Sequence, residues 1–204
     1  TSVLYHYMLS WSLAFLLCVP IACIYSEEGA DIFKNFYYII ISPSNLITDY
    51  FNVGGMGSTF LNVALCGLAC NLMVRKSKAK PNSRILAGYF LVIAHCFYGL
   101  NFLNMWPPFM GIILYCIVTK KKISENIHIA FFATALAPFV SELCFRYAME
   151  NYDPTVVRVN WVGVLLSLVC GLAIGFIIPA LLPETAKMHH GYSLYKAGLA
   201  IGIL

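Results

Sequence analysis

Long apolar runs separated by short polar stretches follow one another along the whole chain. They cover residues 5–25, 56–74, 85–103, 107–118, 127–145 and 161–182, and a further run starts near residue 192. A helix rises about 1.5 Å per residue, so about 20 residues cross the roughly 30 Å hydrocarbon core of a bilayer. Barrel strands would instead read as short alternating segments. The pattern predicts an all-α fold, a polytopic transmembrane helical bundle.

Composition agrees with a lipid-facing surface. Of the 204 residues, 60% are hydrophobic and only 11% are charged, against about 25% charge in soluble domains. The mean hydropathy is +0.78. The net charge of +4 does not indicate nucleic-acid binding, because the basic residues sit in short clusters between apolar runs. The expected partners are the lipid bilayer and a small polar solute, and the sequence leaves a homo-oligomer open.

The positions of Lys and Arg predict the orientation. Eight of the 13 lie in two stretches, five within residues 75–84 and three at residues 120–122. Connections rich in Lys and Arg stay in the cytoplasm. The chain is therefore expected to be multi-pass with a cytoplasmic N-terminus. Gly54 and Gly55 then lie near the outer face.

The segment 31–53 is apolar but cannot cross the membrane once, since both of its ends are expected outside. It contains an aromatic and isoleucine-rich run followed by Ser42-Pro43-Ser44-Asn45. One interpretation is a re-entrant hairpin that breaks near Pro43, with backbone buried in protein or lining a wet cavity. The other is an interfacial helix on the outer surface. The sequence leaves both open.

The run at residues 107–118 is short, since twelve helical residues cover only about 18 Å. Trp106-Pro107-Pro108 gives the run a defined start, because proline is tolerated in the first turn. A polar turn at residues 101–104 would then lie below the outer surface. A tilted helix, or one that continues into the basic loop, is the alternative.

A faint internal repeat links two stretches, residues 47–67 and 182–202. An offset of 135 positions matches Asp49 with Glu184 and Gly67 with Gly202. Chance composition is the competing explanation. Five spans would precede the sixth, so the second unit would enter the membrane upside down, as in inverted-repeat transporters. We expect residues 1–150 to form one unit of five transmembrane helices plus the hairpin, and residues 159–204 to begin a second. The complete protein would then be longer than this chain.

Candidate site residues are polar or ionisable groups in apolar surroundings, where each is costly, together with a glycine that permits a tight turn. Asp49 has the alternative role of a helix cap. Glu142 has Arg146 one turn away as an ion-pair partner, and His95 reads equally as a core residue. The predicted substrate pathway comprises Asn45, Asp49, Gly55, Asn62, His95, Asn101, Glu142, Glu184 and His190.

The sequence contains no motif typical of catalysis or of metal binding. All eight cysteines fall in apolar stretches and read as small packing residues. His189 and His190 are adjacent, so on a helix their side chains diverge and do not form a zinc pair. No nucleophile with a base, phosphate loop or metalloprotease motif appears. We expect no metal, no cofactor and no enzyme.

Two resemblances add to these inferences. Residues 48–62, Tyr98-Gly99-Leu100-Asn101, residues 106–109, 137–142 and 190–195 resemble a Firmicutes family of multi-pass membrane proteins of unknown function. That family is bacterial and about twice as long, so the resemblance implies that the location is a bacterial inner membrane and that this chain is an N-terminal half. Residues 55–67 and 98–101 are also similar in arrangement to urea transporters, which have a re-entrant pore helix in each inverted repeat. The signature of that family is absent, since Leu182-Pro183-Glu184-Thr185 does not match it.

The sequence therefore favours a membrane channel or secondary transporter for a small polar solute. It does not specify the solute or a coupling ion. A membrane-embedded structural or interaction protein without a permeation path is the second hypothesis, and an intramembrane enzyme is the third.

Overall fold

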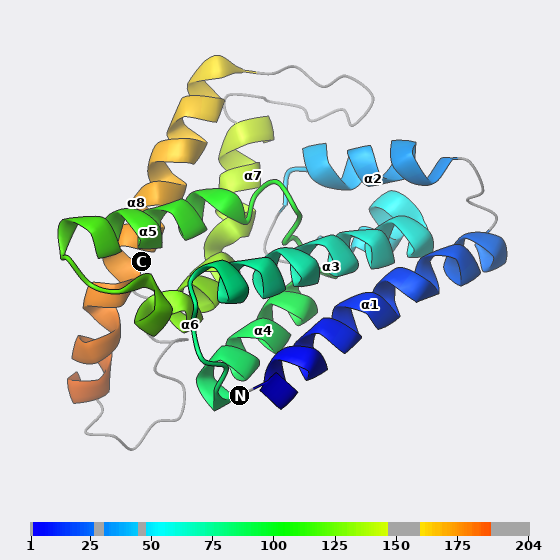
Figure 1. Cartoon of the computed structure of the whole chain (residues 1–204). Coiled ribbons are helices and arrows are strands. Elements are labelled where there is room, and N and C mark those ends of the chain that lie inside the picture. Colours follow the sequence, from blue (N-terminus) through cyan, green and yellow to red (C-terminus); the bar gives the residue numbers. More distant parts are fainter. Residues whose placement is uncertain (1, 27–30, 45–47, 147–159, 189–204) are drawn as a thin grey trace.

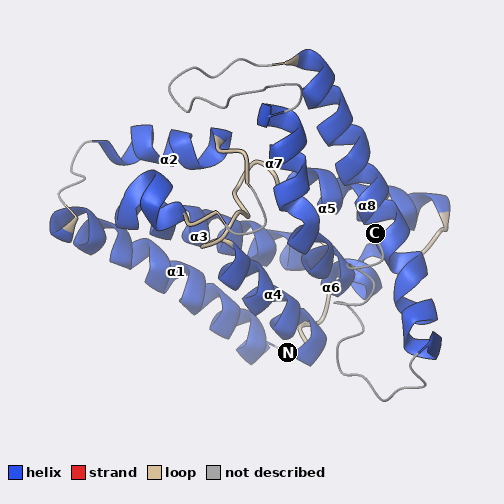
Figure 2. Cartoon of the chain, turned by 180° about the vertical axis from the view of Figure 1, so that it is seen from behind, coloured by secondary structure: helices blue, strands red, loops and turns tan. Residues whose placement is uncertain are grey.

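The chain forms a bundle of helices in a computed structural model. The structure describes residues 2–26, 31–44, 48–146 and 160–188. Within these ranges the chain consists of helices, loops and turns, and no strand occurs (Figure 2). In chain order (Figure 1) the elements are α1 (Ser2–Tyr25), α2 (Ile32–Ile41), α3 (Tyr50–Lys76), α4 (Ser83–His95), α5 (Trp106–Val118), α6 (Ile123–Ala133), the 3-10 turn η2 (Thr134–Leu136), α7 (Ala137–Arg146) and α8 (Trp161–Met188).

Four stretches of the described chain are long and apolar enough to cross a membrane. They are Val3–Tyr25, Tyr50–Lys76, Ile123–Arg146 and Trp161–Glu184. The helical membrane bundle predicted from the sequence is confirmed. By contrast, α4 and α5 have 13 residues each, which is about 20 Å of helix. Two of the predicted crossings are therefore shorter than a bilayer core.

The predicted span at residues 85–103 is wrong in its second half. The helix α4 ends at His95, and the following turn contains Gly99 with a φ of 97°, a conformation that side chains disfavour. The predicted run at 127–145 corresponds to α6, η2 and α7 in succession. The predicted run at residues 161–182 is longer than expected, since α8 continues through Pro179 and Pro183 to Met188.

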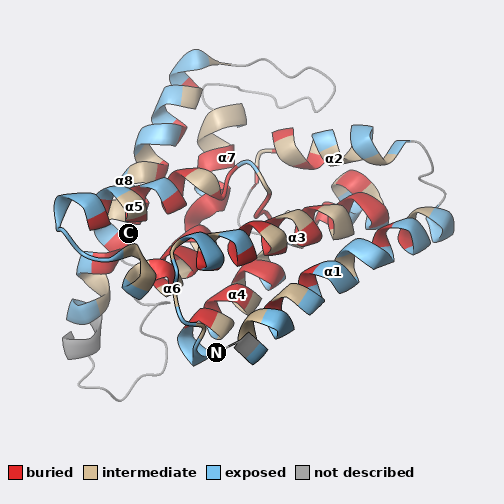
Figure 3. Cartoon of the chain, in the orientation of Figure 1, coloured by how far each residue is buried: buried red, intermediate tan, exposed pale blue. Residues whose placement is uncertain are grey.

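Polar side chains join α1, α3 and α4 in the interior. The Ser12 hydroxyl lies 2.7 Å from the Tyr89 hydroxyl, and Tyr89 donates to the carbonyl of Met8 at 2.8 Å. Asn71 donates to Ser12 Oγ at 3.0 Å. Gly67 permits this contact, because a Cβ there would lie 2.6 Å from Ser12 Oγ. Figure 3 shows the result: most of α3 is buried, whereas α1 has an exposed outer face.

The described residues of the segment 31–53, which exclude residues 45–47, contain no helix long enough to cross. The helix α2 has 10 residues and ends at Ile41, where Ser42 turns to extended backbone with a ψ of 128°. It packs on α3 so closely that a Cβ on Gly54 would lie 2.6 Å from the Ile39 side chain. Phe33 on its other face is exposed. The choice between a re-entrant hairpin and an interfacial helix stays a prediction.

Glycines bring α5 and α8 into backbone contact. A Cβ on Gly111 would lie 2.3 Å from the Leu172 carbonyl, and one on Gly175 would lie 2.0 Å from the Pro108 carbonyl. Further along, the rings of Tyr115 and Phe176 lie 5.7 Å apart. The contacts advance in the same direction on both helices, so α5 and α8 run parallel.

Replacing Gly175 should therefore separate these helices. We expect Gly175→Val to lower the free energy of unfolding by about 3 kcal/mol, because the new side chain overlaps the α5 backbone. Thermal unfolding in detergent micelles measures the change. The matched control is Ala173→Val, two residues away at an exposed position of α8. Equal thermal midpoints for the two variants would contradict the close contact.

Candidate functional site

The break between α4 and α5 is the most polar part of the interior. We call residues 96–105 the elbow. Asn101 and Asn104 lie in it with exposed fractions of 0% and 1%. The backbone N–H of Asn101 donates to Asn104 Oδ1 at 2.8 Å. In return, Asn101 Oδ1 accepts from the N–H groups of Leu103 and Asn104 at 3.0 and 2.9 Å. The two side chains thus replace the hydrogen bonds that a helix would have made.

Asn62 on α3 completes the bracing of the elbow. Its Nδ2 donates to the carbonyls of Cys96 and Leu100 at 3.0 and 2.9 Å, and its Oδ1 accepts from the Phe102 N–H at 3.1 Å. Asn62 is fully buried. Unpaired backbone groups in an apolar interior each cost several kcal/mol. One side chain therefore satisfies three backbone groups of a turn more than 30 residues away.

The segment between α2 and α3 meets the elbow directly. Asn101 Nδ2 donates to the Ile39 carbonyl and to the Tyr50 hydroxyl, both at 3.2 Å. The Tyr50 N–H donates to the Phe97 carbonyl at 3.2 Å, and the Tyr50 hydroxyl lies 2.9 Å from Ser44 Oγ. Two interruptions of regular helix, far apart in sequence, are therefore packed against each other. Asn101, which lies in the elbow, makes hydrogen bonds to the other interruption.

Asp49 and Gly55 shape the start of α3. The Asp49 carboxylate accepts from the Phe51 N–H at 2.9 Å and from Asn52 Nδ2 at 2.8 Å. It therefore acts as a helix cap, as the alternative interpretation expected. Gly55 has a φ of 77° and bends the helix. The bend places the rings of Phe51 and Phe60 6.1 Å apart.

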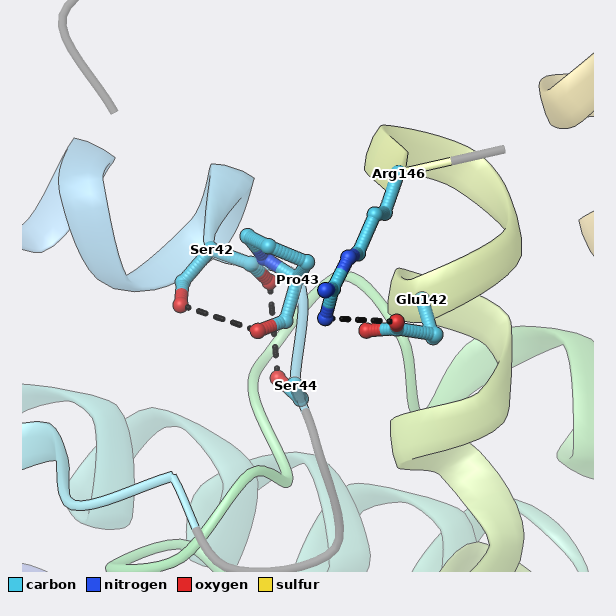
Figure 4. Close-up of polar contacts among 5 residues, drawn as sticks. All are labelled: Ser42, Pro43, Ser44, Glu142 and Arg146. Carbon is cyan, nitrogen blue, oxygen red and sulfur yellow. Dashed lines mark hydrogen bonds and ion pairs between the residues drawn. The ribbon is translucent and has the colours of Figure 1, made fainter. Parts of the chain in front are cut away.

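His95 and Glu142 lie near the elbow but make local contacts. His95 is the last residue of α4, and its Nδ1 lies 2.7 Å from the Leu91 carbonyl. Glu142 pairs with Arg146 one turn later on α7, at 3.2 Å. Figure 4 shows this pair directed towards Ser42, Pro43 and Ser44. Within the described part of the chain, Glu142 Oε2 is buried without a hydrogen-bond partner.

Of the three other predicted site residues, only Glu184 is described, and it does not join this cluster. Glu184 is an exposed residue inside α8, so it does not follow a break as Asp49 does. Asn45 and His190 lie outside the described residues. The structure thus brings Asn62, Asn101 and the start of α3 together, and it leaves Glu184 apart.

A cavity of about 220 Å³ adjoins the elbow on the side of α7 and α8. Its wall is mainly apolar, with polar groups from Asn104, Ser141 and Ser167. Asn104 Nδ2 donates to Ser141 Oγ at 2.8 Å. Sequence reasoning named the turn 101–104 but missed these three as site residues. The sequence did not indicate Ser167 as a site residue, because it is a single small polar residue in an apolar run.

The described residues contain no group of three or more His, Cys, Asp or Glu side chains suited to a metal ion. Their cysteines are free thiols, and four of them, Cys66, Cys70, Cys96 and Cys116, are buried. Cys66 donates weakly to Asn62 Oδ1 at 3.8 Å, so Cys66 borders the asparagine cluster. The arrangement offers amide and hydroxyl groups, which can donate hydrogen bonds to neutral polar groups and accept hydrogen bonds from them.

The asparagine cluster should dominate the stability of this region. We expect Asn101→Leu, which is close in size, to lower the free energy of unfolding by about 3 kcal/mol or more. The reason is that it leaves buried N–H and carbonyl groups unpaired. Unfolding in mixed micelles with dodecyl sulfate provides the measurement. Asn126→Leu is the control, since its side chain makes one exposed bond to the Lys122 carbonyl. If the control is destabilised as much, the bracing role is refuted.

Comparison with known proteins gives one match. Neither the curated proteins nor the solved structures contain a significant match to the chain. A family model described as "Protein of unknown function (DUF1576)" matches residues 28–204, a range that includes the elbow, the segment before α3 and all of α8. The chain therefore belongs to this family of proteins of unknown function, DUF1576.

Proposed function

We propose that the protein is a membrane channel or secondary transporter for a small polar solute. The observation that carries the proposal is the contact between the elbow and the segment preceding α3. Non-helical backbone at membrane depth occurs where it is buried in protein or lines a cavity. In transporters such breaks lie near the bilayer midplane at the substrate site. Here two breaks share one residue, Asn101, which donates to the Ile39 carbonyl and to Tyr50.

The lengths of the helices support this proposal. The helices α4 and α5 are both too short to cross, and each has one end at the elbow. Their other ends carry the basic connections at residues 77–82 and 119–122. The hairpin of α4 and α5 would therefore enter from the basic side and return to it. The segment 31–53 would approach the same point from the opposite side.

The direction of α8 supports an inverted second unit. Because α8 runs parallel to α5, it ends on the side of the basic residues 120–122. The first turn of α1 lies beside Arg75 and Lys78, so α1 begins on the basic side. A second unit starting at α8, after a first unit at residues 1–150, would thus be upside down. The residues that would form its hairpin, 189–204, lie outside the described part.

The conformation described here is closed at the elbow. The amide groups of Asn62, Asn101 and Asn104 are engaged within the chain, so a solute could reach them only if the elbow moved. Gly55 and Gly99, with φ values of 77° and 97°, stand at the two bends and are the proposed hinges. We place the protein in a bacterial inner membrane with the basic side in the cytoplasm, and we assign it no catalysis.

A membrane-embedded scaffold without a permeation path is the second candidate. The same satisfied asparagines favour it, because a fully paired polar network rigidifies a protein. The two candidates differ in whether the elbow ever meets water.

Solute flux into vesicles tests the transport proposal. We expect the full-length protein, reconstituted in liposomes, to accelerate uptake of at least one small neutral polar solute, such as urea or glycerol, over empty liposomes. Gly99→Ala should reduce that uptake at least tenfold, because alanine disfavours the φ of 97°. Ala173→Ser, at an exposed position of α8, is the control and should retain it. Uptake equal to that of empty liposomes for a broad panel of solutes would contradict the proposal.

Thiol labelling tests whether water reaches the elbow. In single-cysteine variants of the full-length protein, a charged aqueous reagent should modify the buried Cys96 of the elbow. It should spare Cys18, which is exposed on the apolar face of α1. A lipid-soluble maleimide should modify Cys18 and so confirm that this thiol is reactive. Protection of Cys96 in vesicles without flux would favour the scaffold.

A further inference from the structure

A hollow of about 370 Å³ lies at the basic end of the bundle, far from the elbow. Tyr5 and His6 on the first turns of α1 form one wall. Arg75, Lys78 and Lys80, at the end of α3 and in the loop that follows, form the other. We call this the basic hollow. It is separate from the proposed solute path, because about half of α3, roughly 20 Å of helix, lies between Asn62 and Arg75.

The backbone at the end of α3 fixes the position of these cations. The Lys78 N–H donates to the Arg75 carbonyl, and the Ala79 N–H donates to the Val74 carbonyl, both at 3.2 Å. Lys78 is in the left-handed region, with a φ of 55°. This is a helix C-cap of the Schellman type, which satisfies the last carbonyls of the helix. The chain therefore turns sharply and directs its basic residues around one space.

Within the described part of the chain, no acidic residue accompanies the cations of the basic hollow. Its described lining includes no Asp or Glu, and no described carboxylate lies in ion-pair contact with Arg75, Lys78 or Lys80. Membrane orientation requires basic residues on one side of the bilayer, but it does not require them to surround a cavity. The hollow is open and its wall is mainly apolar, with Arg75, Lys78 and Lys80 along one side. Three cations on one side of an open hollow are suited to a phosphate group, which accepts charge-assisted hydrogen bonds from Arg and Lys.

The surroundings favour a lipid phosphate over a soluble one. The basic hollow opens beside α1, whose outer face is apolar and exposed along its length. Val3 and Tyr7 lie at the level of the hollow, and Leu17 and Ile24 lie further along. A phospholipid with its headgroup in the hollow would lay its acyl chains along this face. Basic pockets between membrane helices bind anionic headgroups in this way.

We propose that the basic hollow binds the phosphate-bearing headgroup of an anionic phospholipid, whose acyl chains lie on the exposed face of α1. The cations and the apolar helix act together, so neither a zwitterionic lipid nor a free phosphate satisfies the site equally well. Binding there would fix α1 against α3, since the two walls of the hollow come from these two helices.

The test measures lipid binding by the purified full-length protein in an uncharged detergent. Short-chain phosphatidylglycerol should raise the thermal midpoint of unfolding in a saturable manner. Short-chain phosphatidylcholine, glycerol phosphate and inorganic phosphate should each need at least tenfold more ligand for the same shift. The double variant Lys78→Gln/Lys80→Gln should raise the phosphatidylglycerol concentration for half the effect by about 30-fold, because each lysine contributes about fivefold.

The matched control is Lys120→Gln/Lys122→Gln. It removes the same charge from the other basic loop, and Lys120 also has a φ of 55° in an equivalent cap at the end of α5. It should change the half-effect concentration less than threefold. Equal losses for the two double variants would show diffuse attraction and overturn the proposal. Equal effects of phosphatidylglycerol and glycerol phosphate would overturn the lipid assignment. If the first double variant does not fold, Lys80→Gln alone, at an exposed position, should cost about fivefold.

Discussion

The need to pair backbone groups inside an apolar interior controls this structure. Each helix end leaves N–H and carbonyl groups without helical partners, and lipid offers no water to replace them. At the elbow, three buried asparagines supply the partners. Asn62 reaches across from α3 to three backbone groups, and Asn101 and Asn104 close the turn between them. Without these side chains, a helix that stopped at His95 would leave unpaired groups in the core.

That bracing makes the elbow the junction of the whole bundle. Asn101 also holds the end of α2 and Tyr50, and Asn104 reaches Ser141 on α7. Segments from α2, α3, α4, α5 and α7 therefore depend on one polar cluster. A second, separate cluster of Ser12, Asn71 and Tyr89 joins α1 to α3 and α4. Motion at the elbow would displace segments of several helices. The packing of α1 on α3 would be affected less, because a separate hydrogen-bonded cluster stabilises it.

The two ends of the bundle differ in chemistry. Within the elbow, the buried asparagine amides are neutral and hydrogen-bonded, and the adjoining cavity is mainly apolar. At the basic end, cations lie along one side of a hollow whose described lining has no acidic residue. Neutral amides suit an uncharged solute, and cations suit an anion. A transport path through the elbow and a lipid site at the basic end are therefore compatible in one molecule.

The sequence by itself determined the membrane bundle, because its long apolar runs leave too few polar residues for a soluble surface. It also marked Pro43, Gly55 and residues 101–104 as places where regular helix is disfavoured, because of their proline, glycine and asparagine residues. It nevertheless extended the third span to residue 103, whereas α4 ends at His95. Asn62 and Asn101 stood out as polar residues in apolar runs, but their partners did not. Prolines alone were ambiguous: Pro43 follows a helix end, whereas Pro183 lies inside α8.

Only the tertiary structure decided where α4 stops and what Asn62 binds, because the hydrogen bonds of the elbow come from residues distant in sequence. It also assigned Asp49 to a helix cap and revealed Asn104, Ser141 and Ser167 around one cavity. The parallel contact of α5 and α8 depends on glycines 64 positions apart, Gly111 and Gly175. The sequence shows which polar residues stand in apolar runs, where burial without a hydrogen bond is costly. Their hydrogen-bond partners come from distant parts of the chain, so only the packed tertiary structure shows them.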